Sequence, residues 1–358
     1  MPKLATVQPA LNNKQKNMET ILVDGKAVKS YTLTNKNGMS AEVTNYGTKI
    51  TRLMVPDRDG KLEDVVLGFD TLQENIDKEP YFGSTCGRFA NRIKDGKFTL
   101  DGVQYTLAQN NGGNALHGGI KGFNAQVWEV IELSDSSICM NYKSADGEEG
   151  YPGNLDCCVT ISVTDDNELK IRYEAETDKP TVIGLTNHSY FNLKGAGNGT
   201  VRDHVLQINA DFHTVLDETS SPTGELRPVD NSPFDFRKPT EIGSVIDAPE
   251  YAAGRGIDNN WAIRKNQPKE LALAAILTEP VSGRKMEVLT TQPGVQIYTA
   301  NWVELQPGKY GKTYAEQESV CLETQNFPNS PNVAHFPTSV LRPGERYEEY
   351  CVYKFSTI

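Results

Sequence analysis

Two residues of this sequence have the types and settings that acid/base chemistry requires. His188 lies in the polar and aromatic segment Thr186-Asn-His-Ser-Tyr-Phe-Asn-Leu193, directly after an apolar stretch. Glu323 lies in Val320-Cys-Leu-Glu-Thr-Gln325, where strand alternation would put it on the face opposite the large aliphatic side chains. If both faces of that strand are covered, desolvation raises the pKa of the carboxyl group towards that of a useful general base. A glutamate on the exposed face of an edge strand fits the same pattern, so both interpretations stay open.

The remaining histidines divide into one candidate and three structural residues. His117 lies in Asn114-Ala-Leu-His-Gly-Gly119, where the glycines allow the backbone to come close to a ligand or to another strand. A histidine in a turn is more often a hydrogen-bonded structural residue than a catalyst. We therefore assign a structural role to His204, His213 and His335.

Other polar residues interrupt ordered patterns and are candidates for binding hydroxyl groups. They are Asn91 and Arg92 after Gly87-Arg-Phe-Ala90, Asp258 before Asn259-Asn-Trp261, and Gln296 after Pro293-Gly-Val295. Each is weak alone, because arginines in turns are usually solvated and Asp before Asn is a common turn signal. The mixture of aromatic and amide side chains around His188 suits a sugar pocket, where rings pack on C–H groups and amides bind hydroxyls.

Composition excludes several classes of partner. The net charge is −11 and the sequence pI is about 5.1, so the chain should repel nucleic acids and anionic membrane surfaces. The longest apolar run, residues 271–277, is far too short to span a bilayer. Six dispersed cysteines suit neither a disulfide framework nor a CxxC metal site, which favours a reducing cytoplasm. Residues 1–17 lack the apolar core of a secretory signal, and we expect a mobile extension there.

Alternating apolar runs separated by turns predict an all-β protein. The clearest hairpin covers residues 96–108, with Asp101-Gly102 as its turn, and further strands are expected over residues 169–175, 295–302 and 350–355. One helix is expected over residues 71–78. Residues 270–277 are rich in Leu and Ala, which favours a helix, but the turn and apolar run that follow favour a hairpin, and we predict a strand. With no repeat or linker, residues 18–358 should form a single domain of stacked antiparallel sheets.

Nine segments together resemble the aldose 1-epimerase family, also called galactose mutarotases. They follow the family order from about residue 30 to the C-terminus, and they are Asn45-Tyr-Gly47, Val66-Leu-Gly-Phe69, Gly87-Arg-Phe-Ala-Asn-Arg-Ile93, Leu116-His-Gly-Gly119, Gly122-Phe123, Thr186-Asn-His-Ser-Tyr-Phe-Asn-Leu193, Asp258-Asn259, Pro293-Gly-Val-Gln296 and Leu322-Glu-Thr-Gln325. The resemblance implies a large antiparallel β-sandwich that binds a sugar in an open cleft and interconverts the α and β anomers of free aldohexoses.

The resemblance also implies a role for each matched residue. Glu323 corresponds to the general base and His188 to the general acid, and the two should flank the hemiacetal. Glu323 would take the C1 hydroxyl proton while His188, as an imidazolium stabilised by nearby carboxylates, protonates the ring oxygen. The groups implied to hold the sugar are Asn91, Arg92, His117, Asp258, Gln296 and, by proximity in sequence, Tyr190. No metal, nucleotide or redox cofactor is implied, the partner is a small sugar, and a monomer is the default.

Three alternatives rank below this one. An enzyme for sugar phosphates would need a cationic pocket, and Arg92 is the only basic residue among the matched binding positions. A carbohydrate-binding sandwich without catalysis would tolerate loss of His188 or Glu323, and both are present. A glycosidase would use two carboxylates, Asp258 and Glu323, which leaves His188 without a task. The sequence does not identify the preferred aldose.

Overall fold

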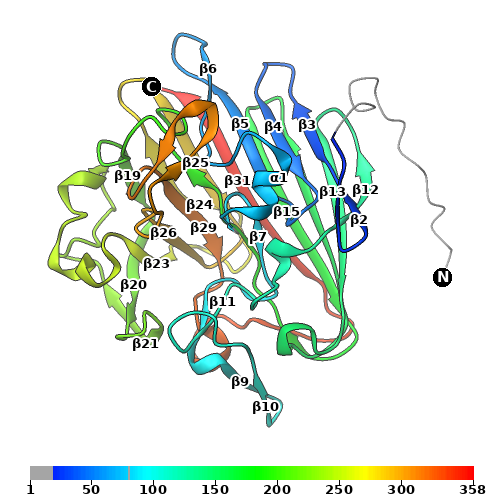
Figure 1. Ribbon diagram of the computed structural model, residues 1–358. Coiled ribbons are helices and arrows are strands. Elements are labelled where there is room, and N and C mark those ends of the chain that lie inside the picture. The colour runs from blue at the N-terminus through cyan, green and yellow to red at the C-terminus, as the bar shows by residue number, and fades with distance from the viewer. Residues whose placement is uncertain (1–18, 80) are drawn as a thin grey trace.

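The computed structural model describes residues 19–79 and 81–358, so the extension expected over residues 1–17 lies outside the described residues. Strands dominate the described part of the chain (Figure 1), and they pair antiparallel throughout the three large sheets. The expected all-β antiparallel fold is confirmed.

The largest sheet has nine strands, and the C-terminal strand lies at its centre. In spatial order its strands are β12 (Glu129–Leu133), β13 (Ser137–Ser144), β14 (Leu155–Val163), β15 (Glu168–Thr177), β31 (Tyr347–Thr357), β25 (Arg284–Thr290), β24 (Ala272–Thr278), β19 (Val205–Ile208) and β22 (Thr240–Glu241). Inward and outward positions alternate along β14 and β15, as expected for strands with one face in a core.

Two smaller sheets complete the layers. The six-stranded sheet runs in the order β18 (Tyr190–Phe191), β29 (Val320–Gln325), β26 (Gly294–Tyr298), β23 (Asp258–Ile263), β20 (Ala210–Leu216) and β21 (Pro222–Pro228). The four-stranded sheet runs in the order β3 (Ser30–Thr34), β4 (Ser40–Thr44), β5 (Ile50–Pro56) and β6 (Leu62–Asp64).

Short ladders and helices join these sheets. The two-stranded ladders are β1 (Ile21–Val23) with β2 (Lys26–Val28), β7 (Thr85–Cys86) with β17 (Thr186–Asn187), β8 (Arg92–Ile93) with β11 (Ala115–Leu116), β9 (Lys97–Leu100) with β10 (Val103–Thr106), β16 (Thr181–Val182) with β30 (Val340–Leu341), and β27 (Gln306–Pro307) with β28 (Thr313–Tyr314). The helices are α1 (Leu72–Asp77) and the single 3₁₀ turns η2 (Lys94–Gly96), η3 (Phe123–Ala125), η4 (Glu148–Gly150), η5 (Ile242–Ser244), η6 (Pro249–Gly254), η7 (Lys309–Gly311) and η8 (Ser330–Asn332). The β9–β10 hairpin projects from the lower end of the molecule in Figure 1.

One hydrophobic core joins the nine-stranded and six-stranded sheets. Tyr353 of β31 donates its hydroxyl hydrogen to the carbonyl oxygen of Leu322 on β29 at 3.1 Å, and its ring lies 4.8 Å from the ring of Phe191. The same cluster of buried side chains includes members of the four-stranded sheet. As a result β29 is buried at every position, which places Glu323 in a covered layer and not on an edge strand.

Most of the expected elements are present. The hairpin over residues 96–108 forms β9 and β10, and residues 71–78 contain α1, which begins with a capping box between Thr71 and Glu74. Most of the ambiguous run over residues 270–277 lies in a strand, β24, which forms six residue pairs with β25 and a bulge between Leu273 and Ala275. The strand expected over residues 295–302 ends earlier, at Tyr298.

Candidate active site

His188 and Glu323 meet at the edge of the six-stranded sheet where β18 pairs with β29. His188 lies in the tight connection between β17 and β18, and the pairing of Tyr190 with Cys321 fixes that connection against Glu323. Nε2 of His188 lies 3.6 Å from Oε2 of Glu323, and the two side chains are only 4% and 2% exposed. The two groups are therefore adjacent and buried together, and their separation is smaller than the width of a hexose ring.

Burial sets the charge of this pair. It raises the pKa of Glu323 well above 4.5, with a further increase from the charge of Asp258 and an opposing effect of Arg92, as the sequence predicted for a desolvated carboxyl group. Burial lowers the pKa of His188 to about 3. The expectation that nearby carboxylates would keep His188 protonated is therefore wrong for the unliganded site, because desolvation outweighs their attraction. Burial thus favours the uncharged form of both groups, a protonated carboxyl group beside a neutral imidazole.

His117 is held by its neighbour Asn91 through a pair of backbone contacts. The N–H of Asn91 donates to Nδ1 of His117 at 3.1 Å, and the N–H of His117 donates to the carbonyl oxygen of Asn91 at 3.1 Å. The two residues have φ values of 65° and 51°, and a Cβ on Gly118 would lie 1.8 Å from the carbonyl oxygen of Gly87. Because Nδ1 accepts a hydrogen bond, the neutral ring carries its hydrogen on Nε2. Burial lowers the pKa of His117 well below 6.5, so it is a neutral donor.

Three of these side chains have the types found in transition-metal sites. Ligand atoms of His117, His188 and Glu323 all lie within 4.8 Å of one another. In His117, however, the lone pair of Nδ1 is occupied by the Asn91 N–H and Nε2 carries the hydrogen, so neither nitrogen is free to bind a metal. Burial also raises the pKa of Glu323 and so favours its protonated carboxyl group, which binds a metal ion poorly. The three residues therefore fit hydrogen bonds to a neutral ligand better than they fit a metal ion.

Asp258 and Arg92 form the partly solvated rim of the same site, and the buried Gln296 connects this rim to Glu323. Gln296 faces Glu323 across the β26–β29 pairing, and its Nε2 donates to Oδ1 of Asp258 at 2.7 Å. Nη1 of Arg92 lies 3.8 Å from Oδ2 of Asp258, and their side chains are 15% and 19% exposed. Nε of Arg92 donates to Oδ1 of Asn111 at 3.0 Å. Exposure thus rises from the His188–Glu323 pair outwards. The entrance of the site is accessible to solvent, and the His188–Glu323 pair at its base is buried.

Three buried polar atoms of the predicted site residues have no hydrogen-bond partner among the described residues. They are Nδ1 of His188, Oε1 of Gln296 and Oε2 of Glu323. Buried polar atoms are normally satisfied, and unsatisfied ones commonly mark a place that a ligand or water fills. All three atoms belong to residues that the sequence assigned to the site.

Aromatic rings enclose the two imidazoles. The ring of Tyr81 lies 4.7 Å from that of His117 and 5.8 Å from that of His188. Tyr190, expected to line the pocket, stacks on His188 at 4.9 Å, and Tyr298 meets the same imidazole at 6.2 Å. Sequence reasoning missed Tyr81, Tyr298 and the support that Asn111 gives to Arg92. Strand alternation could have found Tyr298, because it lies two residues after Gln296 on the same face of β26.

The three histidines assigned a structural role have structural contacts. His204 accepts a hydrogen bond from the Leu193 N–H at Nε2, at 3.0 Å. The ring of His213 stacks on Phe234 at 3.8 Å, and Nε2 of His335 lies 2.7 Å from the carbonyl oxygen of Gly224.

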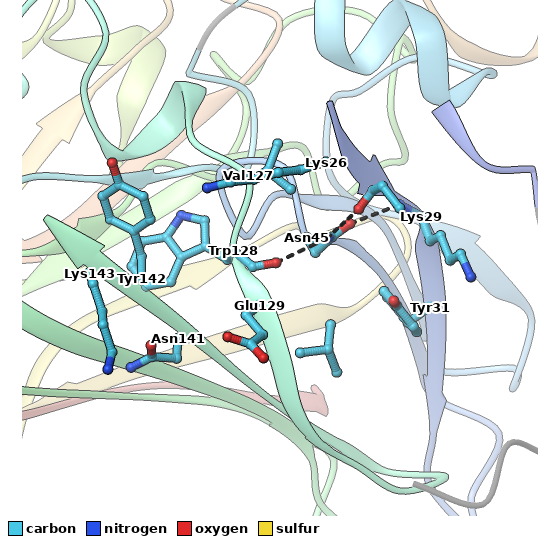
Figure 2. Close-up of a pocket in the computed structure, with 12 residues that line it drawn as sticks. Lys26, Lys29, Tyr31, Asn45, Val127, Trp128, Glu129, Asn141, Tyr142 and Lys143 are labelled. Carbon is cyan, nitrogen blue, oxygen red and sulfur yellow. Dashed lines mark hydrogen bonds between the residues drawn. The ribbon is translucent and has the colours of Figure 1, made fainter. Parts of the chain in front are cut away.

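A separate hollow of about 590 Å³ lies beside β2, β12 and β13, and none of the candidate site residues lines it. Figure 2 shows Asn45 at its centre, donating to the carbonyl oxygens of Ala27 and Trp128 and accepting from the Lys29 N–H. Because the side-chain amide of Asn45 already makes hydrogen bonds within the protein, we interpret this hollow as a structural gap between sheets.

Among the described residues, no helix combines the length and the apolar character that a bilayer crossing would need.

The antiparallel fold brings a buried histidine beside a buried carboxyl group, and these are the side-chain types that proton-transfer enzymes use. Residues 29–354 match the model of the family described as Aldose 1-epimerase. Galactose mutarotase of Sus scrofa is 45% identical over 319 residues, which cover 89% of this chain and 91% of that protein. Galactose mutarotase of Rattus norvegicus is 43% identical over 333 residues, which cover 93% of this chain and 95% of that protein.

A crystal structure of an aldose epimerase homologue from C. elegans superposes with a TM-score of 0.85 at 34% identity, covering 93% of this chain and 100% of the other. The chain therefore belongs to the aldose 1-epimerase family. This confirms the resemblance stated from the sequence and the enzyme class that it implied, an isomerase.

Proposed function

We propose that this protein interconverts the α and β anomers of free aldohexoses such as glucose and galactose. The observation that carries the proposal is the buried His188–Glu323 pair, whose facing atoms lie 3.6 Å apart and which together hold one proton. Ring opening needs one proton removed from the C1 hydroxyl and one delivered to the ring oxygen. A pair with one proton and one vacant acceptor meets both needs.

Adjacency suits this reaction because the two reacting oxygens are bonded to the same carbon. A sugar placed with its C1 edge against the pair brings the C1 hydroxyl to one group and the ring oxygen to the other. We assign Glu323 as general base and His188 as general acid in ring opening, with the roles exchanged in closure. The proton must first pass from the carboxyl group to the imidazole, and the sugar hydroxyls favour this transfer by providing hydrogen bonds to the charged forms.

The surrounding groups offer hydrogen-bond donors, acceptors and charges that suit a polyhydroxylated ligand. His117 offers a hydrogen from Nε2, Gln296 offers its vacant Oε1, and Asp258 and Arg92 supply a carboxylate and a cation at the rim. Asn91 acts by holding His117 in place, since its N–H occupies Nδ1 of that ring. These groups hold the sugar while the open aldehyde rotates about C1–C2. Only protons move, so the proposed reaction needs no metal, nucleotide or redox cofactor.

The contacts of Arg92 argue against a sugar phosphate as the substrate. This guanidinium already faces Asp258 and donates to Asn111. A phosphate group would compete with the Asp258 carboxylate for it, and the negative charge of Asp258 would repel a bound phosphate.

We further propose that residues 18–358 form a single domain that works as a monomer in the cytoplasm, with residues 1–17 as an extension. One core cluster that reaches from Tyr31 to Phe355 supports the single domain, and six free cysteines support a reducing compartment.

Polarimetry tests the activity directly. Freshly dissolved α-D-glucose and α-D-galactose should reach anomeric equilibrium faster with the protein than in the buffer blank, in proportion to enzyme concentration. Relaxation at the blank rate with every aldose tried would reject the proposal.

A further inference from the structure

A cavity of about 880 Å³, here called the β30 cavity, lies between the end of β23, the short strand β30 and the start of β31. Its volume is within the range of about 300–1,000 Å³ that pockets for small molecules have. None of the candidate active-site residues lines it. Much of its wall is apolar or aromatic, and these side chains include Ile183, Ile263, Pro293, Phe327, Leu341 and Tyr347. The cavity therefore suits the apolar body of a small molecule.

Hydrogen bonds hold two walls of the β30 cavity in place. The Tyr347 hydroxyl accepts from the Leu185 N–H and from Nε2 of Gln292, each at 3.0 Å. Nδ2 of Asn326 donates to the carbonyl oxygens of residues 337–338 at 3.1 and 3.0 Å. Because these contacts exist without a ligand, the cavity is preformed, and binding does not have to order its walls.

One cation in the wall is hydrogen-bonded only to backbone carbonyl groups among the described residues. Nζ of Lys265 donates to the carbonyl oxygens of Glu270 and Thr290 at 2.6 and 2.8 Å, which leaves one of its three hydrogens without an acceptor. The carboxylate of Glu270 instead accepts from the N–H and the side-chain amide of Asn266. Burial lowers the pKa of Lys265 to about 8, so the half-buried group is still a cation at pH 7.

The other charged side chains of the wall already have partners. Lys269 pairs with Glu349, and Arg346 pairs with Glu174. Oε2 of Glu345 accepts from a backbone N–H at 3.0 Å. Lys265 is thus the charged group of the wall that is available to a new partner, and that partner must be an anion.

The wall also contains a buried hydroxyl group without a hydrogen-bond partner among the described residues. Ser339 is 5% exposed, and its Oγ is the unpaired atom. Unsatisfied buried polar atoms commonly mark a place that a ligand or water fills. Both Ser339 and Lys265 have a hydrogen to donate, which favours a ligand that carries an acceptor. A negatively charged acceptor also offsets the cost of the half-buried ammonium charge.

We propose that the β30 cavity binds a small monocarboxylate with an apolar body, the chemistry of a medium-chain fatty acid. The carboxylate accepts a hydrogen bond from the ammonium of Lys265, and the apolar body packs against side chains such as Phe327 and Leu341. This binding needs neither His188 nor Glu323, because neither residue lines the cavity.

Three probes with the same chain length test the chemistry of the site. Isothermal titration calorimetry of the full-length protein at pH 7 compares octanoate with octanol and octylammonium. Octanoate should bind saturably and at least about tenfold more tightly than octanol, because a hydrogen bond between charged groups contributes that much or more. Octylammonium should bind still more weakly, since Lys265 repels it. Equal affinities for the three probes, or no saturable binding of octanoate, would overturn the proposal.

A matched pair of lysine variants locates the bound carboxylate. Lys265→Met removes the charge but keeps an apolar side chain, and it should weaken octanoate binding at least about tenfold while octanol binding stays nearly unchanged. Lys97→Met makes the same change on the exposed face of β9, outside the cavity, and should keep the affinity for octanoate. Unchanged octanoate affinity in Lys265→Met, or an equal loss for both probes, would overturn the role of Lys265.

Competition with a sugar separates the β30 cavity from the His188–Glu323 site. Excess D-galactose should leave the affinity for octanoate unchanged, because the two sites share no lining residue. Displacement of octanoate by the sugar would place it in the His188–Glu323 site and overturn the assignment to the cavity.

Discussion

The shared proton of His188 and Glu323 makes a quantitative prediction for a double-mutant cycle. General acid or base catalysis by one positioned group contributes about 10²- to 10⁴-fold, or roughly 3–5 kcal/mol of barrier. We expect Glu323→Gln and His188→Asn each to reduce kcat by a factor in that range. If the two groups acted independently, the double variant would lose the product of the single losses, about 10⁴- to 10⁸-fold.

Geometry predicts a much smaller combined effect. With 3.6 Å between Nε2 and Oε2 and one proton between them, removal of either group leaves the other without its proton donor or acceptor. The double variant should therefore be no more than a few-fold slower than the worse single variant, as expected for residues that act as a unit. Initial rates by polarimetry, corrected for the buffer blank, measure all four corners of the cycle.

A folding control accompanies these measurements. Because burial already keeps Glu323 protonated, the neutral and nearly isosteric glutamine should leave the melting temperature unchanged or slightly raised. Losses in the double variant equal to the product of the single losses, with melting temperatures preserved, would refute the shared proton.

Four further predictions concern pH, charge, metals and stability. We expect kcat/KM to fall on the acid side only as the pH approaches about 3, because His188 becomes protonated there while Glu323 is already protonated. Half-maximal activity near pH 6.5 would contradict this prediction. Asp258→Asn removes a charge that raises the pKa of Glu323, so the alkaline limb should move to lower pH; an upward move would count against the assignment. Dialysis against EDTA should leave kcat unchanged, whereas activity lost and then restored by a divalent metal would show that our tautomer argument fails. Lys309→Met should cost roughly 3 kcal/mol in urea unfolding, because it removes the buried cation that lies 2.5 Å from Oδ2 of Asp64 and leaves this carboxylate with Arg52 and Tyr310. Addition of Asp64→Asn should recover part of the loss, and equal stability of the single and double variants would contradict a buried ion pair.

Local signals predicted much of the fold. Thr71 and Glu74 mark the start of α1 because a capping box is a contact within four residues. Asp101-Gly102 marks the β9–β10 turn for the same reason. Local propensity alone did not predict the conformation of residues 270–277, because it favours a helix. The turn that follows brings β25 alongside, and pairing with β25 makes the segment a strand.

The site was predicted in its residues but not in its electrostatics. Motif order identified the side chains that the structure brings together around His188 and Glu323, yet it predicted a protonated His188, whereas burial makes the imidazole of the unliganded site neutral. The number of neighbouring carboxylates can be counted from a sequence, but the depth of burial cannot, and burial decided the outcome. Tyr81 was missed because its ring reaches both imidazoles from a turn that no periodic pattern places.

The antiparallel register of β23, β26 and β29 means that this active site exists only in the native sheet. Gln296 faces Glu323, and Asp258 faces Tyr298, through consecutive backbone ladders. Because side chains alternate between the two faces of a strand, a slip of one residue would turn Gln296 away from Glu323 and towards the core. A partly folded chain with these three strands misaligned would therefore be inactive, and recovery of the proposed activity during refolding would require their native pairing.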